Sequence, residues 1–131
     1  MSIFSKIISG ELPSHKVAET EDFFAFLDIN PNAPGHTLCV PKKEVDKLFD
    51  LDEELYDGLM KFSRKVALAM REVMDCKRIG MSVIGLEVPH VHVHLIPLRD
   101  MEDMRFNNKV QLSSSKMQQI ADDFSKAYKN L

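Results

Sequence analysis

The sequence of 131 residues contains only two cysteines and no tryptophan. Cys39 and Cys76 lie far apart, and neither belongs to a Cys-x-x-Cys pair, which argues against a zinc knuckle or a cysteine redox centre. Two isolated thiols are typical of a reducing compartment. We therefore expect a cytoplasmic protein.

The sequence also lacks long apolar runs and clusters of one charge. No stretch of about 18 apolar residues occurs, and the N-terminus has no basic segment followed by an apolar one, so neither secretion nor membrane spanning is expected. Lys and Arg number 17 against 20 Asp and Glu. Because these basic residues are scattered, long nucleic acid is not an expected partner. A small anion stays possible, since a few donors converging in a cleft can bind phosphate.

The chain contains enough hydrophobic residues to form one hydrophobic core. Hydrophobic residues make up 44% of the chain, and its length is usual for a single domain, which we expect over residues 1–131. Short apolar stretches between turn-forming residues predict strands. We expect a hairpin within 15–27, a third strand over 37–40, and two more over 79–84 and 91–96.

Helical periodicity appears in three places. Ser2 is a suitable N-cap for a short helix over 2–9, and apolar residues at alternating spacings of four and three predict a long helix over 52–76. A last amphipathic helix is expected after Ser115. The sum is an α+β fold, in which one long and one C-terminal helix pack against an antiparallel sheet of about five strands.

The most distinctive pattern is the alternation of His90, His92 and His94 with apolar residues. In a strand, such alternation directs all three imidazoles to one face and the apolar side chains to the other. Imidazole changes charge near neutral pH, so a row of imidazoles can supply a nucleophile, a hydrogen-bond donor to phosphate and a proton carrier.

Two other interpretations of this row are open. The histidines could be solvent-facing strand residues without a role, although five histidines in the whole chain make three on one face improbable by chance. A His-x-His pair could also bind zinc with a further ligand from elsewhere. All three cannot readily ligate one ion, because the Cα atoms of His90 and His94 would lie about 13 Å apart in a strand.

Residues 90–96 resemble the signature of the histidine triad (HIT) nucleotide hydrolases and transferases, His-φ-His-φ-His-φ-φ, in which φ is apolar. The opening block over 3–13 is similar to that of the family, as are 26–31, 34–36 and 40–43. These ordered blocks cover nearly the whole chain, so the resemblance is more specific than one motif would make it.

The resemblance implies a covalent mechanism in which His92 attacks the α-phosphorus of a nucleoside phosphoramidate, a dinucleoside polyphosphate or a related ester. Water would then release a nucleoside monophosphate from the nucleotidyl-histidine. The backbone of His90 would accept a hydrogen bond from His92, and the His90 and His36 side chains would support that orientation. His94 would hydrogen-bond the phosphate and assist the leaving group. This scheme implies no metal and no cofactor.

The resemblance also implies how a purine nucleotide would bind. Asp28 would accept hydrogen bonds from the ribose hydroxyls, although it could instead cap the turn at Asn30. The apolar slot around the base would consist of Ile3, Phe4, Ile7, Phe26 and Ile29. A homodimer is implied as well, in which the long helix and a strand edge pair across a two-fold axis. His15 is expected at the surface without a catalytic role.

The sequence departs from the family at two places. Ser2, Ser5 and Glu44 stand where many relatives carry the cysteines and histidine of a structural zinc site, so no zinc is expected there. Leu86 replaces a glutamine that commonly binds phosphate, and Glu87 adds a negative charge nearby. A nucleotide-binding or sensing protein with little turnover is therefore the alternative, followed by a His-x-His metal-dependent hydrolase. The C-terminal helix and the absence of tryptophan indicate a branch other than Hint.

Overall fold

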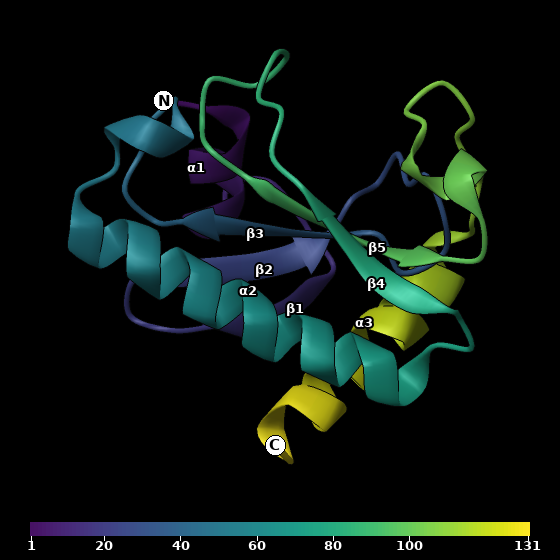
Figure 1. Cartoon of the computed structure of the whole chain (residues 1–131). Coiled ribbons are helices and arrows are strands. Elements are labelled where there is room, and N and C mark those ends of the chain that lie inside the picture. Colours follow the sequence, from purple (N-terminus) through teal and green to yellow (C-terminus); the bar gives the residue numbers. More distant parts are fainter.

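The computed structural model describes residues 1–131 and contains a five-stranded antiparallel sheet with the strand order β1-β2-β3-β5-β4 (Figure 1). The strands are β1 Lys16–Glu19, β2 Phe23–Leu27, β3 Thr37–Pro41, β4 Arg78–Ser82 and β5 Val93–Leu98. The predicted α+β class and strand number are thus confirmed. The last strand begins two residues later than expected because the Val91 N–H donates to the Val45 carbonyl, outside the sheet.

The helices are α1 Ile3–Ile8, α2 Glu53–Val73 and α3 Ser114–Lys129, with short 3₁₀ helices η1 Leu48–Asp50 and η2 Met101–Met104. Ser2 caps α1 by accepting the Ser5 N–H, as the sequence predicts, and Asp52 caps α2 in the same way. Helix α2 ends three residues before the predicted boundary, since Met74 is extended and packs against the core. No helix combines the length and apolarity that crossing a membrane requires.

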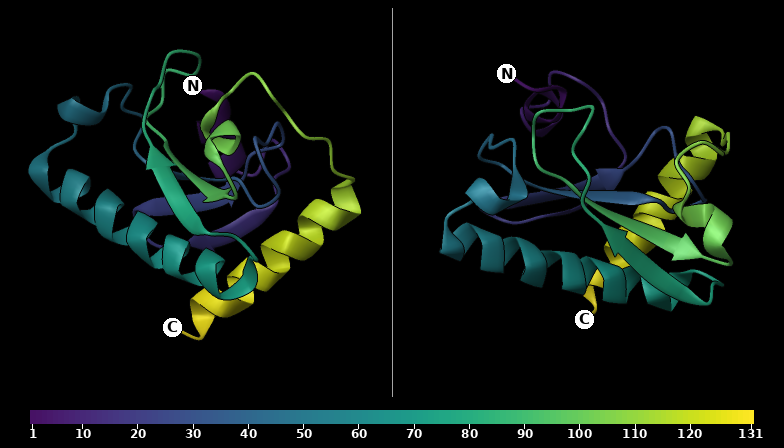
Figure 2. Two further views of the ribbon diagram at one scale, coloured as in Figure 1. Left: turned by 45° about the vertical axis from the view of Figure 1, so that its right-hand side comes forward. Right: turned by 45° about the horizontal axis from the view of Figure 1, so that its top comes forward.

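The sheet separates two apolar layers. Helices α2 and α3 cover one face and α1 covers part of the other, as the views in Figures 1 and 2 show. The larger cluster lies under α2 and α3 and includes Val91, Val93 and Leu95. Phe4 of α1 belongs to the smaller cluster on the opposite face. The residues that alternate with the histidines therefore face the main core, which leaves the histidine face toward α1.

A glycine turn places His36 at the start of β3. Gly35 has a φ of 90°, a backbone conformation that favours glycine. A Cβ at this position would also lie 2.9 Å from the Cζ atom of Phe124 in α3. The sheet, the turn and α3 thus meet directly beneath His36.

Candidate active site

A cleft of about 430 Å³ lies on the histidine face of the sheet. Its walls come from α1, the end of β2, β3, the loop between β4 and β5, β5 itself and the segment after η2. The lining residues are Ile3, Phe4, Asp28, Asn30, Leu38, Ile84, Gly85, Leu86, Glu87, Val88, His92, His94, Phe106 and Lys109. A second hollow of about 470 Å³ between β1 and α3 contains no histidine. Only the first brings imidazoles together with a carboxylate.

His92 is held in one orientation. Its Nδ1 lies 2.8 Å from the carbonyl oxygen of His90, which can only accept, so Nδ1 carries the proton. With the proton on Nδ1, the lone pair of the neutral ring lies on Nε2. Phe4 packs edge-on against the His92 ring at a centroid distance of 4.9 Å and restricts its rotation. In this tautomer Nε2 is the nitrogen that can act as a nucleophile.

His90 does not line the cleft, and both of its ring nitrogens have partners. Nε2 donates to the carbonyl of Pro41 at 2.8 Å, so Nδ1 accepts from the Ser2 hydroxyl at 2.6 Å. The side chain is fully buried. His90 can therefore fix the backbone carbonyl that orients His92, but its ring has no free atom for a substrate.

His36 determines the tautomer of His94. The backbone N–H of Asn32 donates to Nδ1 of His36 at 3.0 Å, so the proton of His36 lies on Nε2. That Nε2–H donates to Nδ1 of His94 at 2.9 Å. The remaining nitrogen of His94, Nε2, is consequently an N–H donor. Burial lowers the pKa of His36 to about 3 and that of His94 to about 4, so both rings are neutral near pH 7.

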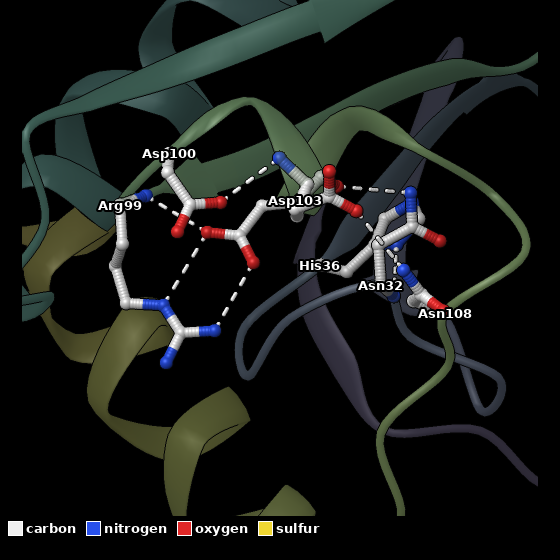
Figure 3. A network of polar contacts seen from close by, with 7 residues as sticks. Asn32, His36, Arg99, Asp100, Asp103 and Asn108 are labelled. Carbon is white, nitrogen blue, oxygen red and sulfur yellow. Dashed lines mark hydrogen bonds and ion pairs between the residues drawn. The ribbon is translucent and has the colours of Figure 1, made fainter.

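A polar network fixes the position of Asn32 (Figure 3). Its side-chain amide donates to the backbone carbonyl of Asp103 at 3.1 Å. The Asp103 carboxylate in turn accepts from the backbone N–H of Arg99 at 2.8 Å and from its guanidinium at 3.0 and 3.3 Å. The hydrogen bonds from the guanidinium are the largest cause of the lowered pKa of Asp103. Helix η2 is thereby joined to the turn that holds His36.

The same histidine pair predicts how stability depends on pH. Unfolded imidazoles titrate near 6.5, whereas His36 and His94 in the folded protein bind protons only near pH 3 to 4. Between these values the unfolded state binds more protons, so the free energy of unfolding should fall as the pH drops from 6.5 to 4.5. The slope should reach about 1.4 kcal/mol per pH unit for each histidine.

Urea denaturation at several pH values measures this slope. His36→Asn should flatten it. His15→Gln is the matched control, because it removes an imidazole that contacts Gln118 at the surface and not the buried pair. Equal slopes for the wild-type protein and His36→Asn would contradict the prediction.

Asp28 lies where β2 ends, with its carboxylate in the cleft. Oδ1 accepts a hydrogen bond from the Asn30 N–H at 2.8 Å, so this oxygen of Asp28 caps the turn at Asn30. The other, Oδ2, lies 3.7 Å from Nε2 of His36 and has no hydrogen bond. Burial raises the pKa of Asp28, against the opposing effects of the Asn30 hydrogen bond and the Lys109 charge. One oxygen is therefore available to a ligand.

The structure changes the expected apolar slot. Ile3 and Phe4 line the cleft, whereas Phe26 is buried beside Phe4 and Ile7 packs against that cluster. Ile29 is 77% exposed and is not among the residues that line the cleft, so its contact with a base stays a prediction. The turn that starts at Asp28 carries the chain out of the sheet and directs Ile29 to solvent.

Several cleft residues could not be found from the sequence. Leu38 lines the cleft from β3, and Phe106 and Lys109 reach it from the segment after η2. That segment carries no motif or periodicity that would place it next to β5. Glu87, which the sequence leaves without an orientation, lines the cleft and adds to the raised pKa of Asp28.

Ser2, Ser5 and Glu44 form a hydrogen-bonded cluster that joins α1 to His90. The Glu44 carboxylate accepts from the backbone N–H of Ser2 and, at 2.8 Å, from the Ser5 hydroxyl. The hydrogen bond from the Ser2 backbone is the largest cause of the lowered pKa of Glu44. Two hydroxyls do not supply the thiolate ligands that zinc favours, and the Nδ1 lone pair of His90 already accepts from Ser2. These residues therefore do not fit a zinc site.

Replacing Ser2 should destabilise the fold locally. Ser2→Ala removes the α1 N-cap and leaves the buried Nδ1 of His90 without a donor, so the free energy of unfolding should fall by about 1 to 3 kcal/mol. Urea denaturation measures this loss. Ser9→Ala is the matched control, because the exposed Ser9 hydroxyl only contacts the Lys6 carbonyl. An effect no larger than that of the control would contradict the role of Ser2.

Asp28, His36 and His94 are the one group whose side chains could converge on a metal ion, with potential ligand atoms within 4.8 Å of one another. Ligation through Nε2 of His36 would need the proton to move to Nδ1, where it would face the Asn32 N–H. The structure therefore favours a hydrogen-bonded relay over a metal centre at this position.

Comparison with known proteins supports the same family as the histidine pattern. A HIT domain model matches residues 9–101. An adenosine 5′-monophosphoramidase from Saccharomyces cerevisiae is 42% identical over 99 residues, which span 75% of this chain and 63% of that protein. A HIT-like protein from Bartonella henselae has a TM-score of 0.84 and 32% identity, covering 96% of this chain and 95% of that one.

A second solved structure is similar to this chain over nearly its full length. The hypothetical histidine triad nucleotide-binding protein from Sulfolobus tokodaii has a TM-score of 0.84 and 27% identity, covering 98% of this chain and 92% of that one. The likeness extends beyond the matched family region to α3. The chain, with its three alternating histidines and this fold, belongs to the HIT family.

Proposed function

We propose that this protein is a nucleotide hydrolase or transferase that cleaves at the α-phosphate of a nucleoside phosphoramidate or dinucleoside polyphosphate and releases a nucleoside monophosphate. The observation that carries the proposal is the fixed tautomer of His92, whose Nε2 lone pair is free because Nδ1 donates to His90. The name of the yeast relative, a monophosphoramidase, supports this substrate class.

The proposed reaction has two displacements at phosphorus. His92 Nε2 attacks the α-phosphorus, and the bond from phosphorus to the leaving amine or phosphate breaks. The leaving group departs with the electron pair of that bond and takes up a proton from solvent. The positive charge that develops on the His92 ring strengthens its hydrogen bond to the His90 carbonyl. Water then attacks the same phosphorus and releases a proton to solvent, and the P–N bond breaks to restore His92.

His94 stabilises charge on the phosphoryl group in this scheme. Its Nε2–H is a neutral donor whose tautomer is already fixed by His36, so no proton has to be rearranged when phosphate binds. The free oxygen of Asp28 would accept from the ribose hydroxyls, and Ile3 and Phe4 would contact the purine base.

AMP release from adenosine 5′-phosphoramidate, with and without a chelator, tests the proposal. We expect release that the chelator does not change. Loss of release with chelator would favour a metal-dependent hydrolase instead. Binding of AMP without any release would support the nucleotide-binding alternative, which Leu86 and the cleft-facing Glu87 favour because they can weaken phosphate activation while leaving binding intact.

The proposal includes a homodimer. Strand β4 lies at the outer edge of the sheet, so its free backbone groups can pair with a second copy. Met81 in this strand is 46% exposed, which provides an apolar contact there. Sedimentation equilibrium of the full chain distinguishes a dimer from a monomer.

We also propose a cytoplasmic location, with Cys39 and Cys76 as free thiols.

A further inference from the structure

Lys109 is the only lysine or arginine that lines the cleft, which also contains the carboxylates of Asp28 and Glu87. A nucleotide phosphate would bring additional negative charge into this space. His94 offers it an N–H group but no full positive charge near pH 7, because burial lowers its pKa to about 4. Lys109 is therefore the one permanent cation available to an anionic ligand.

Lys109 is held in place without a carboxylate partner. Its ammonium donates to Oδ1 of Asn32 at 2.7 Å, and none of the ion pairs in the structure includes it. The Asn32 amide is oriented by its bond to Asp103, and the Val110 N–H donates to the Pro31 carbonyl at 2.9 Å. An ammonium has three N–H groups, so two remain for a ligand, and no carboxylate lies within ion-pair distance of it.

A row of aromatic rings connects the proposed nucleophile with Lys109. The ring centroids from Phe4 to His92, from His92 to His94 and from His94 to Phe106 are each 4.9 Å apart. The Lys109 ammonium lies 4.8 Å from the Phe106 ring centroid. Lys109 thus lies at the His94 end of the row, opposite the end where Phe4 would contact the base.

We propose that Lys109 binds a phosphate oxygen of the nucleotide, so that the cleft selects 5′-phosphorylated nucleosides over nucleosides. This inference rests on the proposed function. Lys109 would give the cleft the phosphate contact that Leu86 cannot provide, and its positive charge would offset the negative charge of Glu87. Lys109 lies outside residues 9–101, the part of the chain that the family model matches.

Calorimetric titration of the full-length protein with AMP and with adenosine tests the role of Lys109. Lys109→Met should weaken AMP binding about tenfold or more, because a charge-assisted hydrogen bond is lost. Adenosine affinity should change by less than about twofold, since the nucleoside has no phosphate for the ammonium to contact. Lys109→Arg should retain most of the AMP affinity. Lys61→Met on the exposed surface of α2 changes the net charge equally and should leave both affinities unchanged.

Two results would overturn the inference alone. The first is AMP binding that survives Lys109→Met. The second is an equal loss for AMP and adenosine, which would mean that Lys109 shapes the cleft or contacts the ribose. A wild-type protein that binds neither compound would instead refute the proposed function, and this inference with it.

Discussion

His92→Ala is expected to reduce AMP release from adenosine 5′-phosphoramidate by about 10⁴-fold or more, since the variant lacks the nitrogen that would form the covalent intermediate. The cleft should still bind AMP, because Asp28, His94 and Lys109 remain in its walls. Initial rates with purified full-length protein, together with AMP affinity by calorimetry, separate the loss of chemistry from a loss of binding.

Two controls make this result specific to His92. His15→Ala removes an imidazole that lies outside the cleft and should leave the rate unchanged. Thermal denaturation of His92→Ala shows whether the variant is folded at the assay temperature. A folded variant that retains more than about a tenth of the wild-type rate would refute the covalent mechanism, because nucleophile removal costs far more than that.

The largest effect on stability is expected for Phe124→Ala. Phe124 is fully buried in the cluster between the sheet and α3, so truncation loses its apolar burial and leaves a cavity. The free energy of unfolding should fall by about 3 to 5 kcal/mol. Because the ring also approaches Gly35, the cavity would lie beneath the turn that positions His36. Urea denaturation of the full chain measures the loss.

Phe49→Ala is the matched control for Phe124→Ala. Phe49 is 86% exposed, so the same truncation there should change the free energy of unfolding by less than about 0.5 kcal/mol. If Phe124→Ala lowers the free energy of unfolding by no more than the small change expected for Phe49→Ala, then the docking of α3 does not depend on Phe124. A loss confined to Phe124→Ala supports the packing described for the layer beneath His36.

The features that the sequence determined are those that depend on near neighbours along the chain. Alternation at a period of two placed Val91, Val93 and Leu95 in the main core and left the histidines on the other face, because successive strand residues point in opposite directions. In the same way, Ser2 could be recognised as the cap of α1, and the apolar stripe predicted α2. Both patterns operate within a few residues, so they need no knowledge of the fold.

The features that only the tertiary structure decided depend on residues far apart in sequence. The tautomer of His94 follows from His36, which is 58 positions away, and His90 is held by Ser2, which is 88 positions away. Lys109 reaches the cleft through Asn32, 77 positions earlier, although nothing in its own segment indicates this. Alternation along the chain placed the three histidines on a common face. Their separate chemical states depend on which distant donor or acceptor the folded chain brings to each ring, and no local periodicity encodes that.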